Sequence, residues 1–249
     1  PLKILIVDDE APARKRLQSL LAECSVLHPL EVVGEAAHGR EALARMEEHP
    51  ADLVLLDIRM PGMDGIEVAQ HLSKLPGPPV VIFTTAYDDY AIAAFEVHAV
   101  DYLLKPIRAE RLAYAVSRGR AIRPVSEHVL QRLALKPREN LSVQERGRVL
   151  LIPIAEVFYL KAELKYVTVK TATREYLLEE SLVHLEQEFS ERFIRIHRNC
   201  LVARDKVQGF ERVSGGDGEI GWVALLKGLD EKPPISRRQQ QIVREFKAR

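Results

Sequence analysis

The sequence predicts a doubly wound α/β domain with a five-stranded parallel sheet, followed by a second, mostly β domain. Up to about residue 120, short apolar runs alternate five times with segments of helical periodicity. That alternation predicts a parallel sheet with helices on both faces. From about residue 138 the chain changes to short runs rich in Val, Ile, Tyr and Phe, which predict strands. We therefore expect domains at 1–120 and 139–249, joined by a linker at 121–138.

The elements of the first domain follow from local patterns. Each expected strand is a short apolar run, and two of these runs end directly at an acidic residue. Pro12 fits the first turn of the first helix, where its missing N–H costs nothing. The later helices carry apolar residues at helical spacing. The expected strands are 2–7, 31–35, 53–56, 80–83 and 101–104, and the expected helices begin near Pro12 and span 39–48, 66–75, 89–96 and 108–119.

Three segments of the rest of the chain depart from the β pattern. Pro124 and Pro137 flank residues 127–135, which are compatible with a helix within the linker. Residues 181–189 predict a helix because their apolar side chains fall on one face. Residues 236–247 are too polar for a buried strand. The second domain is therefore expected to be mostly, but not entirely, β.

Composition limits the class of protein. The chain carries 13 basic and 18 acidic residues up to Arg120, and 23 basic and 18 acidic residues after it. An acidic half suits a cation site and a mildly basic half suits nucleic acid. Cys24 and Cys200 are far apart in sequence, which favours free thiols in a reducing compartment. No apolar run approaches the roughly 18 residues of a membrane span, and the first run is too short for a signal peptide. We expect a soluble cytoplasmic protein.

Chemically active side chains follow four of the expected strands. Asp8 and Asp9 follow the first strand, Asp57 the third, Thr85 the fourth and Lys105 the fifth. Binding sites of open parallel sheets form at these carboxyl ends. If the first and third strands are neighbours, three carboxylates converge. A hard divalent cation such as Mg²⁺ is the expected counter-ion.

This set of side chains suits phosphoryl transfer. Asp57 stands before a Pro/Gly-rich loop that can expose it, so its carboxylate can act as the nucleophile and form an acyl phosphate. Lys105 and Thr85 can bind the phosphoryl oxygens. Taken singly, each residue has a structural explanation; an Asp pair after a strand, for example, often caps the next helix. The complete set, in order at matched strand ends, favours the functional explanation.

Residues 1–120 resemble the receiver domain of bacterial two-component systems. The resemblance rests on ILIVDDE, LVLLDIRMPGMDG, the Thr85-Ala86 step and YLLKP. It implies a flavodoxin-like fold and a sensor histidine kinase that donates a phosphoryl group to Asp57. It also implies that Thr85, Lys105 and Tyr102 are switch residues that sense the phosphoryl group. For Tyr102, an aromatic ring packed in the core is an equally good explanation.

The same resemblance implies a magnesium site. Asp9, Asp57 and the backbone carbonyl of Arg59 would bind Mg²⁺ directly, and Asp8 would act through water. An enzymatic alternative is a phosphatase of the haloacid-dehalogenase type, which also uses a carboxylate nucleophile with Mg²⁺. Those enzymes need a second Asp two residues after the nucleophile, and Arg59 occupies that position here. We therefore expect a regulator and not an enzyme.

A basic and polar cluster marks the second domain. The segment FIRIHRNCLVAR places Arg195, His197, Arg198 and Asn199 close together, and SRRQQQ follows later. These side chains combine charge that binds phosphates with groups that read bases. The domain lacks the helices of a helix-turn-helix and has no Cys/His metal pattern. The structural alternative is a polar strand face that continues into a hairpin turn.

Residues 139–245 resemble the LytTR-type DNA-binding domain, the output module of the LytR/AlgR family of response regulators, and the whole chain is most similar to AlgR-type members. The motifs are IPIAEVFYLKAELKYVTV, the helix at 181–189, RFIRIHRNCLVAR and ISRR. The resemblance implies that loops and short segments bind successive major grooves of promoter DNA. His197 is expected to support its loop. The implied contact residues are Lys165 or Tyr166, Arg198 with Asn199 beside it, and Arg238 with Arg237 beside it.

Our hypothesis for how the two domains cooperate is a population shift. Phosphorylation of Asp57 pulls Thr85 and favours a homodimer, so that two output domains occupy paired DNA sites. The remaining alternative is a receiver joined to a protein-binding or RNA-binding β domain. Salt-dependent, sequence-specific binding of duplex DNA would distinguish the two.

Overall fold

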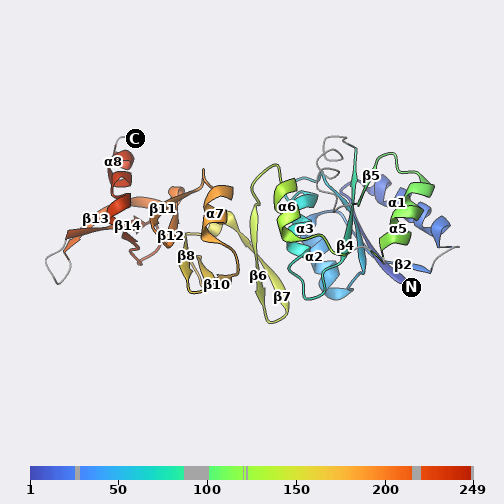
Figure 1. Cartoon of the computed structure of the whole chain (residues 1–249), viewed down its shortest axis with the longest axis horizontal. Coiled ribbons are helices and arrows are strands. Elements are labelled where there is room, and N and C mark those ends of the chain that lie inside the picture. The colour runs from blue at the N-terminus through green and yellow to red at the C-terminus, as the bar shows by residue number, and fades with distance from the viewer. Residues whose placement is uncertain (26–28, 87–100, 120, 122, 215–219, 248–249) are drawn as a thin grey trace. The chain divides into compact units, whose positions relative to one another are not determined.

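The computed structural model describes residues 1–25, 29–86, 101–119, 121, 123–214 and 220–247. These residues form two compact units (Figure 1). The first comprises 1–136 with 145–149, and the second comprises 137–144 with 150–249. None of the described helices is long and apolar enough to cross a membrane.

The first unit is built on a parallel sheet with strand order β2-β1-β3-β4-β5. Burial of β1, β3 and β4 explains their continuous apolar sequences. All five predicted strands are present, so the fold prediction is confirmed for this unit. The strands are β1 (Leu2–Val7), β2 (Leu30–Ala36), β3 (Leu53–Asp57), β4 (Val80–Thr85) and β5 (Asp101–Leu104).

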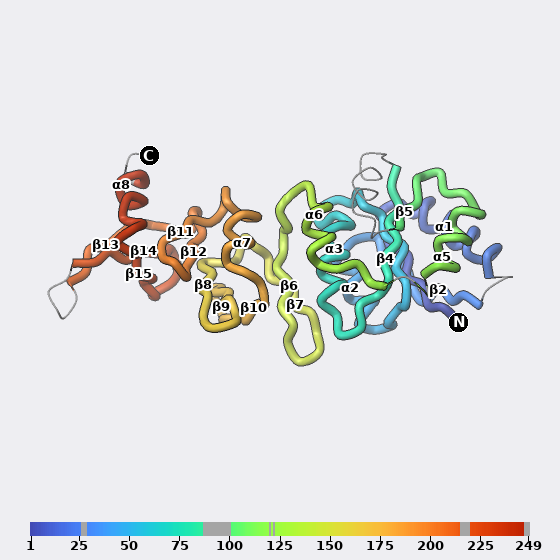
Figure 2. The backbone as a smooth tube through the Cα atoms, viewed as in Figure 1, coloured from blue at the N-terminus to red at the C-terminus, as the bar shows by residue number. Residues whose placement is uncertain are grey.

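Helices cover both faces of this sheet, as Figure 2 shows. α1 and α5 contact each other over one face, and α2 and α3 pack together over the other. The predicted helix at 89–96 lies outside the described residues. The described helices are α1 (Ala11–Cys24), α2 (Gly39–Glu48), α3 (Gly65–Leu72), α5 (Ala109–Gly119) and α6 (Glu127–Leu133).

The helix expected within the linker is α6, and it packs against α3. Leu130 and Leu133 of α6 are buried, as are all eight residues of α3. Because α6 belongs to the first unit, that unit continues to Lys136, beyond the predicted end of the first domain at residue 120. The predicted linker therefore contains a helix that packs on the first unit.

The second unit is mostly antiparallel β structure, as predicted. Its main sheet has the order β10-β9-β8-β12-β11, and a smaller sheet has the order β13-β14-β15. The main sheet contains β8 (Tyr159–Glu163), β9 (Tyr166–Lys170), β10 (Glu175–Leu178), β11 (Phe193–His197) and β12 (Cys200–Ala203). The other strands are β6 (Asn140–Glu145), β7 (Arg148–Pro153), β13 (Val207–Ser214), β14 (Ile220–Leu226) and β15 (Pro234–Ile235). The helical segments are η1 (Ile154–Glu156), α7 (Leu182–Glu188), η2 (Arg204–Lys206), η3 (Arg237–Gln239) and α8 (Gln241–Lys247).

Alternation along the main sheet builds two separate cores. Leu160 and Leu201 point to the core that includes α7, whereas Tyr159 and Cys200 point to the core that includes α8. Both faces of β8 and β12 are thereby covered. The turns at the ends of these strands remain at the surface, where their side chains can meet a partner.

Candidate functional site

The first candidate site forms where β1 and β3 end side by side. Val7 pairs with Leu56, so the next residue of each strand, Asp8 and Asp57, lie opposite each other. Asp8 is fully buried, Asp57 is 5% exposed and Asp9 is exposed. Carboxylate oxygens of these three residues lie within 4.8 Å of one another. The strand order therefore brings together the three acids that the sequence separates.

Lys105 completes this acidic cluster. Its Nζ donates a hydrogen bond of 2.7 Å to Asp8 Oδ2 and lies 3.4 Å from Asp57 Oδ2. Burial lowers the pKa of Lys105, but its hydrogen bond to Asp8 and the charge of Asp57 outweigh burial and raise it above its ordinary value. Burial raises the pKa of the Asp57 carboxyl to about 6, while Lys105 opposes the rise and Asp8 adds to it. The site thus places two buried carboxyl groups beside a single ammonium group.

The ends of β4 and β5 border this cluster. Asp57 is paired with Thr84, and Ile58 N–H donates to the Thr84 carbonyl at 3.0 Å. Thr85 is the next residue along β4, is fully buried, and its carbonyl accepts from Lys105 N–H at 2.8 Å. The backbone thus places the ends of β4 and β5, which carry Thr85 and Lys105, next to the strand end that carries Asp57. The role of Thr85 and Lys105 as switch residues stays a prediction.

Tyr102 lies farther from the acidic cluster along the sheet. It pairs with Phe83, two residues before Thr85, and its carbonyl accepts from Arg111 at 3.1 Å. The side chain is partly buried. Its role as a switch aromatic stays a prediction.

The loop between β3 and α3 is held closely against Asp57. The backbone N–H of Arg59 donates to the Asp57 carboxylate. At the other end of the loop, Gly65 N–H donates to the Ile58 carbonyl at 2.8 Å, and Asp64 caps α3 by accepting from Glu67 N–H at 2.9 Å. Both ends of the loop are therefore hydrogen-bonded to the end of β3 or to the residue that follows it.

The acidic cluster fits a hard divalent cation. Its donor set consists of carboxylate oxygens, which Mg²⁺ prefers, and the surplus of negative charge over Lys105 favours a counter-ion. The Arg59 carbonyl follows Asp57 by two residues, within the same loop. The residues predicted to hold Mg²⁺ are thus compatible with that ion.

The second candidate site consists of three neighbouring segments in the second unit. The turn between β8 and β9 carries Lys165, which is exposed, and Tyr166, which is partly buried, is the first residue of β9. Lys165 Nζ lies 4.9 Å from the centroid of the Tyr166 ring. The turn between β11 and β12 carries Arg198 and Asn199, and η3 carries Arg237 and Arg238. All three arginines are exposed. Apart from Tyr166, which begins β9, the predicted contact residues therefore lie at turns or in a short helical segment.

Backbone hydrogen bonds join these three segments. Ala162 N–H donates to the Asn199 carbonyl at 2.7 Å, which ties the end of β8 to the second turn. Ser236 N–H donates to the Ile196 carbonyl at 2.8 Å, which ties the start of η3 to the end of β11. The middle segment is thus bonded to both of its neighbours, and the three form one surface.

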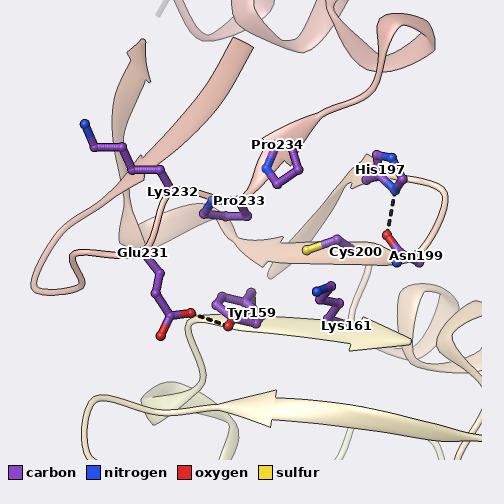
Figure 3. A pocket seen from close by; sticks show the side chains of 9 residues that line it. All are labelled: Tyr159, Lys161, His197, Asn199, Cys200, Glu231, Lys232, Pro233 and Pro234. Atoms are coloured by element: carbon purple, nitrogen blue, oxygen red, sulfur yellow. Dashed lines mark hydrogen bonds between the residues drawn. The ribbon is translucent and has the colours of Figure 1, made fainter. Parts of the chain in front are cut away.

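Arg195 and His197 support the middle turn. Arg195 Nη1 donates to the Arg198 carbonyl at 2.7 Å, and its guanidinium also pairs with Glu186. His197 Nδ1 lies 2.5 Å from Asn199 Oδ1 (Figure 3). These contacts are compatible with the expected supporting role of His197. They also show that Arg195, which the sequence analysis placed in the basic cluster as a candidate for phosphate or base contacts, is bonded within the protein. The acid that binds Arg195 lies nine residues away on α7, so no local pattern signals the pair.

A pocket of about 260 Å³ adjoins this turn (Figure 3). Tyr159 donates to Glu231 at 2.5 Å across its rim, and Cys200 forms part of its wall. Burial raises the pKa of the Cys200 thiol to about 12. The thiol is therefore protonated at neutral pH and unreactive as a nucleophile.

A buried ion cluster was not predicted from the sequence. Arg138, at the start of the second unit, is 4% exposed and donates to Glu180 at 2.9 and 2.7 Å and to Glu188 at 2.9 and 2.8 Å. Its partners lie more than 40 residues away. The cluster fixes the beginning of this unit onto α7.

Comparisons with known proteins identify both parts of the chain. Residues 4–117 match the family described as response regulator receiver domain, and residues 147–248 match the LytTr DNA-binding domain. The chain is 43% identical over 250 residues to the positive alginate biosynthesis regulatory protein of Pseudomonas aeruginosa, covering 98% of each chain. It is 34% identical to the sensory transduction protein LytT of Bacillus anthracis, covering 80% of this chain and 82% of that one. It is 28% identical to the transcriptional regulatory protein YpdB of Escherichia coli, covering 99% and 98%.

These matches span nearly the whole chain, with the receiver match around the acidic cluster and the DNA-binding match around the three turn segments. The chain therefore belongs to the LytR/AlgR family of two-component response regulators, transcriptional regulators that join a receiver domain to a LytTR DNA-binding domain.

Proposed function

We propose that Asp57 accepts a phosphoryl group from a sensor histidine kinase and that this controls binding of promoter DNA by the second unit. The observation that carries the first half is the convergence of Asp8, Asp9, Asp57 and Lys105 at adjacent strand ends. Two buried acids and a third exposed one around a single lysine leave an excess of negative charge, which is unfavourable without a bound cation. The protein is accordingly proposed to be a regulator and not an enzyme.

The proposed transfer follows from the geometry of the acidic cluster. A carboxylate oxygen of Asp57 attacks the phosphorus, the new O–P bond forms, and the P–N bond to the donor histidine breaks. The electron pair of the broken bond stays on the imidazole nitrogen, which then takes up a proton. Lys105 Nζ, already 3.4 Å from Asp57, binds a phosphoryl oxygen, and the Thr85 hydroxyl donates to another. Water can later hydrolyse the acyl phosphate, which returns Asp57 and inorganic phosphate and limits the lifetime of the signal.

Mg²⁺ is the proposed cofactor. Asp9, Asp57 and the Arg59 carbonyl would hold it directly, with Asp8 acting through water. When bound, the ion would offset the negative charge that the acids and the phosphoryl group bring together. The acids would hold the ion in place, and Lys105 would keep its bond to Asp8 and bind the phosphoryl group.

Double-stranded promoter DNA is the proposed partner of the second unit. Arg198 and Arg238 present guanidinium groups suited to two-point contacts with guanine or phosphate, and Asn199 and Arg237 lie beside them. Lys165 and Tyr166 form the third part of the same surface. The hydrogen bonds between the three segments favour a surface that meets DNA as a unit.

Phosphorylation is further proposed to favour a homodimer that occupies paired DNA sites. Such control of dimerisation requires only that the free energy of dimerisation differ between the phosphorylated and unphosphorylated forms. A kinase phosphodonor and promoter DNA together imply that the protein acts in the cytoplasm.

The experiment that tests the phosphoacceptor is incubation with acetyl phosphate and Mg²⁺, followed by intact-mass measurement. The wild type should gain the mass of one phosphoryl group, whereas Asp57→Asn should gain none. Asp52→Asn is the matched control, because Asp52 is exposed and lies outside the acidic cluster, where its carboxylate accepts from Lys3 N–H at 2.9 Å. Equal labelling of the wild type and Asp57→Asn would overturn the assignment.

A further inference from the structure

The linker helix α6 lies on the receiver helix whose N-terminus adjoins the phosphoacceptor loop. Leu130 and Leu133 are buried at 1% and 3% exposure in the first unit, where α6 and α3 are in contact. Lys74, just after α3, pairs with Glu127 of α6 at 2.6 Å. α6 is therefore held to α3 by both apolar and ionic contacts.

A second connection joins the end of the linker to the loop itself. Lys136 Nζ donates to the Gly62 carbonyl at 2.9 Å and lies 3.9 Å from the Asp64 carboxylate. Both partners belong to the loop that follows Asp57, and Asp64 caps α3. Lys136 is thus bonded to the loop that directly follows Asp57.

The loop has little freedom to absorb such a change. At its start, the Arg59 N–H is bonded to the Asp57 carboxylate. At its end, Gly65 packs so closely that an added Cβ would lie 2.1 Å from the Asp57 carbonyl oxygen. Conversion of the carboxylate to an acyl phosphate places a bulky anionic group beside the bond that the Arg59 N–H makes. Because both ends of the loop are fixed, we expect the change to be taken up between them, near Gly62 and Asp64.

We propose that Lys136 is a phosphorylation-sensitive latch that holds the linker helix α6 on the receiver until Asp57 is phosphorylated. The proposal rests on Asp57 being the phosphoacceptor. In the chain, only Pro137 separates Lys136 from Arg138, which Glu180 and Glu188 fix in the second unit. Release of Lys136 therefore changes the constraint at the point where the chain enters the DNA-binding unit. The alternative is that α6 is a static part of the receiver, equally well held in both states.

Amide hydrogen exchange of α6 separates these two accounts. The full-length variants are Lys136→Met, which removes the ammonium group, and Lys15→Met, a control at an exposed lysine of α1. Asp64→Asn is a second test, because Asn still caps α3 but removes the charge near Lys136. Each protein is measured with and without acetyl phosphate and Mg²⁺, and intact mass in the same samples reports the extent of phosphorylation.

The latch predicts two results. Without phosphorylation, the amides of α6 exchange about fivefold faster in Lys136→Met than in the wild type, the factor expected for loss of one such hydrogen bond. Asp64→Asn shows a smaller increase in the exchange rate, and Lys15→Met shows none. On phosphorylation, wild-type α6 accelerates to the rate of Lys136→Met, and the variant changes no further.

The contrary results are equally distinct. If intact mass shows phosphorylation but α6 exchange is unchanged, the latch is wrong and the phosphoacceptor assignment stands. If Lys136→Met matches Lys15→Met, Lys136 does not hold α6. If no phosphorylation occurs on the wild type, the proposed function fails and the latch fails with it.

Discussion

Gly65 packs directly against the backbone of Asp57: a Cβ at Gly65 would lie 2.1 Å from the Asp57 carbonyl oxygen. That distance is shorter than any ordinary contact, and the obstructing atom belongs to the backbone. The first residue of α3 and the last residue of β3 are therefore matched in shape. This close approach lets the loop between them turn back on the phosphoacceptor.

The first prediction concerns this contact. Gly65→Ala should destabilise the receiver by about 2 kcal/mol, because either the Asp57 backbone or α3 must move to relieve the overlap. Urea unfolding followed by circular dichroism measures the change. Gly77→Ala is the matched control, since its Cβ would have no neighbour within 4 Å. Equal stability of the two variants would contradict the prediction, because it would show that the backbone between β3 and α3 moves aside at little cost in free energy.

The second prediction concerns the buried cluster around Arg138. Arg138→Met should destabilise the second unit by about 3–5 kcal/mol, because Glu180 and Glu188 would be left buried without their cation. Fluorescence of Trp222, the only tryptophan of the chain, reports unfolding of this unit. Arg244→Met, at an exposed position of α8, is the control.

Rescue distinguishes an unpaired charge from lost packing at this cluster. Adding Glu180→Gln and Glu188→Gln to Arg138→Met removes the uncompensated charges and should restore much of the lost stability. If the triple variant is no more stable than Arg138→Met, the arginine stabilises the unit mainly through its packing on Phe189, whose ring centroid lies 5.9 Å from the guanidinium carbon.

The third prediction concerns DNA recognition. Arg198→Ala should weaken binding to a duplex selected from a random pool by roughly tenfold to a hundredfold, the usual effect of losing a two-point base contact. Fluorescence anisotropy at several salt concentrations measures affinity and its salt dependence. Arg174→Ala is the control, because Arg174 is exposed beyond the opposite end of β9 from Lys165. An affinity equal to that of the control would remove Arg198 from the contact surface.

The fourth prediction concerns Cys200. Its pKa of about 12, raised chiefly by burial, keeps almost all of the thiol protonated up to a pH of about 9, so alkylation in the native protein should stay slow across that range. In urea the same thiol recovers an ordinary pKa and a large thiolate fraction by about pH 9, so it should react much faster than the native thiol at the same pH. Iodoacetamide labelling followed by peptide mapping compares the two states. Rapid labelling of native Cys200 at neutral pH would contradict its assigned burial.

Local patterns predicted most of the fold for a physical reason. Strands such as β3 and helices such as α2 depend on runs and periodicities that lie within the element itself. The acidic cluster was also predictable, because the carboxyl ends of parallel strands meet at one edge and Asp57 and Lys105 follow such strands.

Long-range contacts explain what the sequence did not reveal. Arg138 finds its acids more than 40 residues away, and Arg195 finds Glu186 on a different element. The linker helix was compatible with the sequence, but its packing on α3 depends on a shared buried surface that periodicity does not specify. For the same reason, the sequence indicated no role for Lys136.

The central claim is that phosphorylation of Asp57 controls DNA binding, and one measurement tests it most directly. Affinity for the selected duplex is measured by anisotropy before and after acetyl phosphate with Mg²⁺, using wild type and Asp57→Asn, with phosphorylation verified by intact mass. We expect the affinity of the wild type to rise on phosphorylation and that of Asp57→Asn to stay constant. A wild type that is fully phosphorylated yet binds DNA with unchanged affinity would contradict the claim.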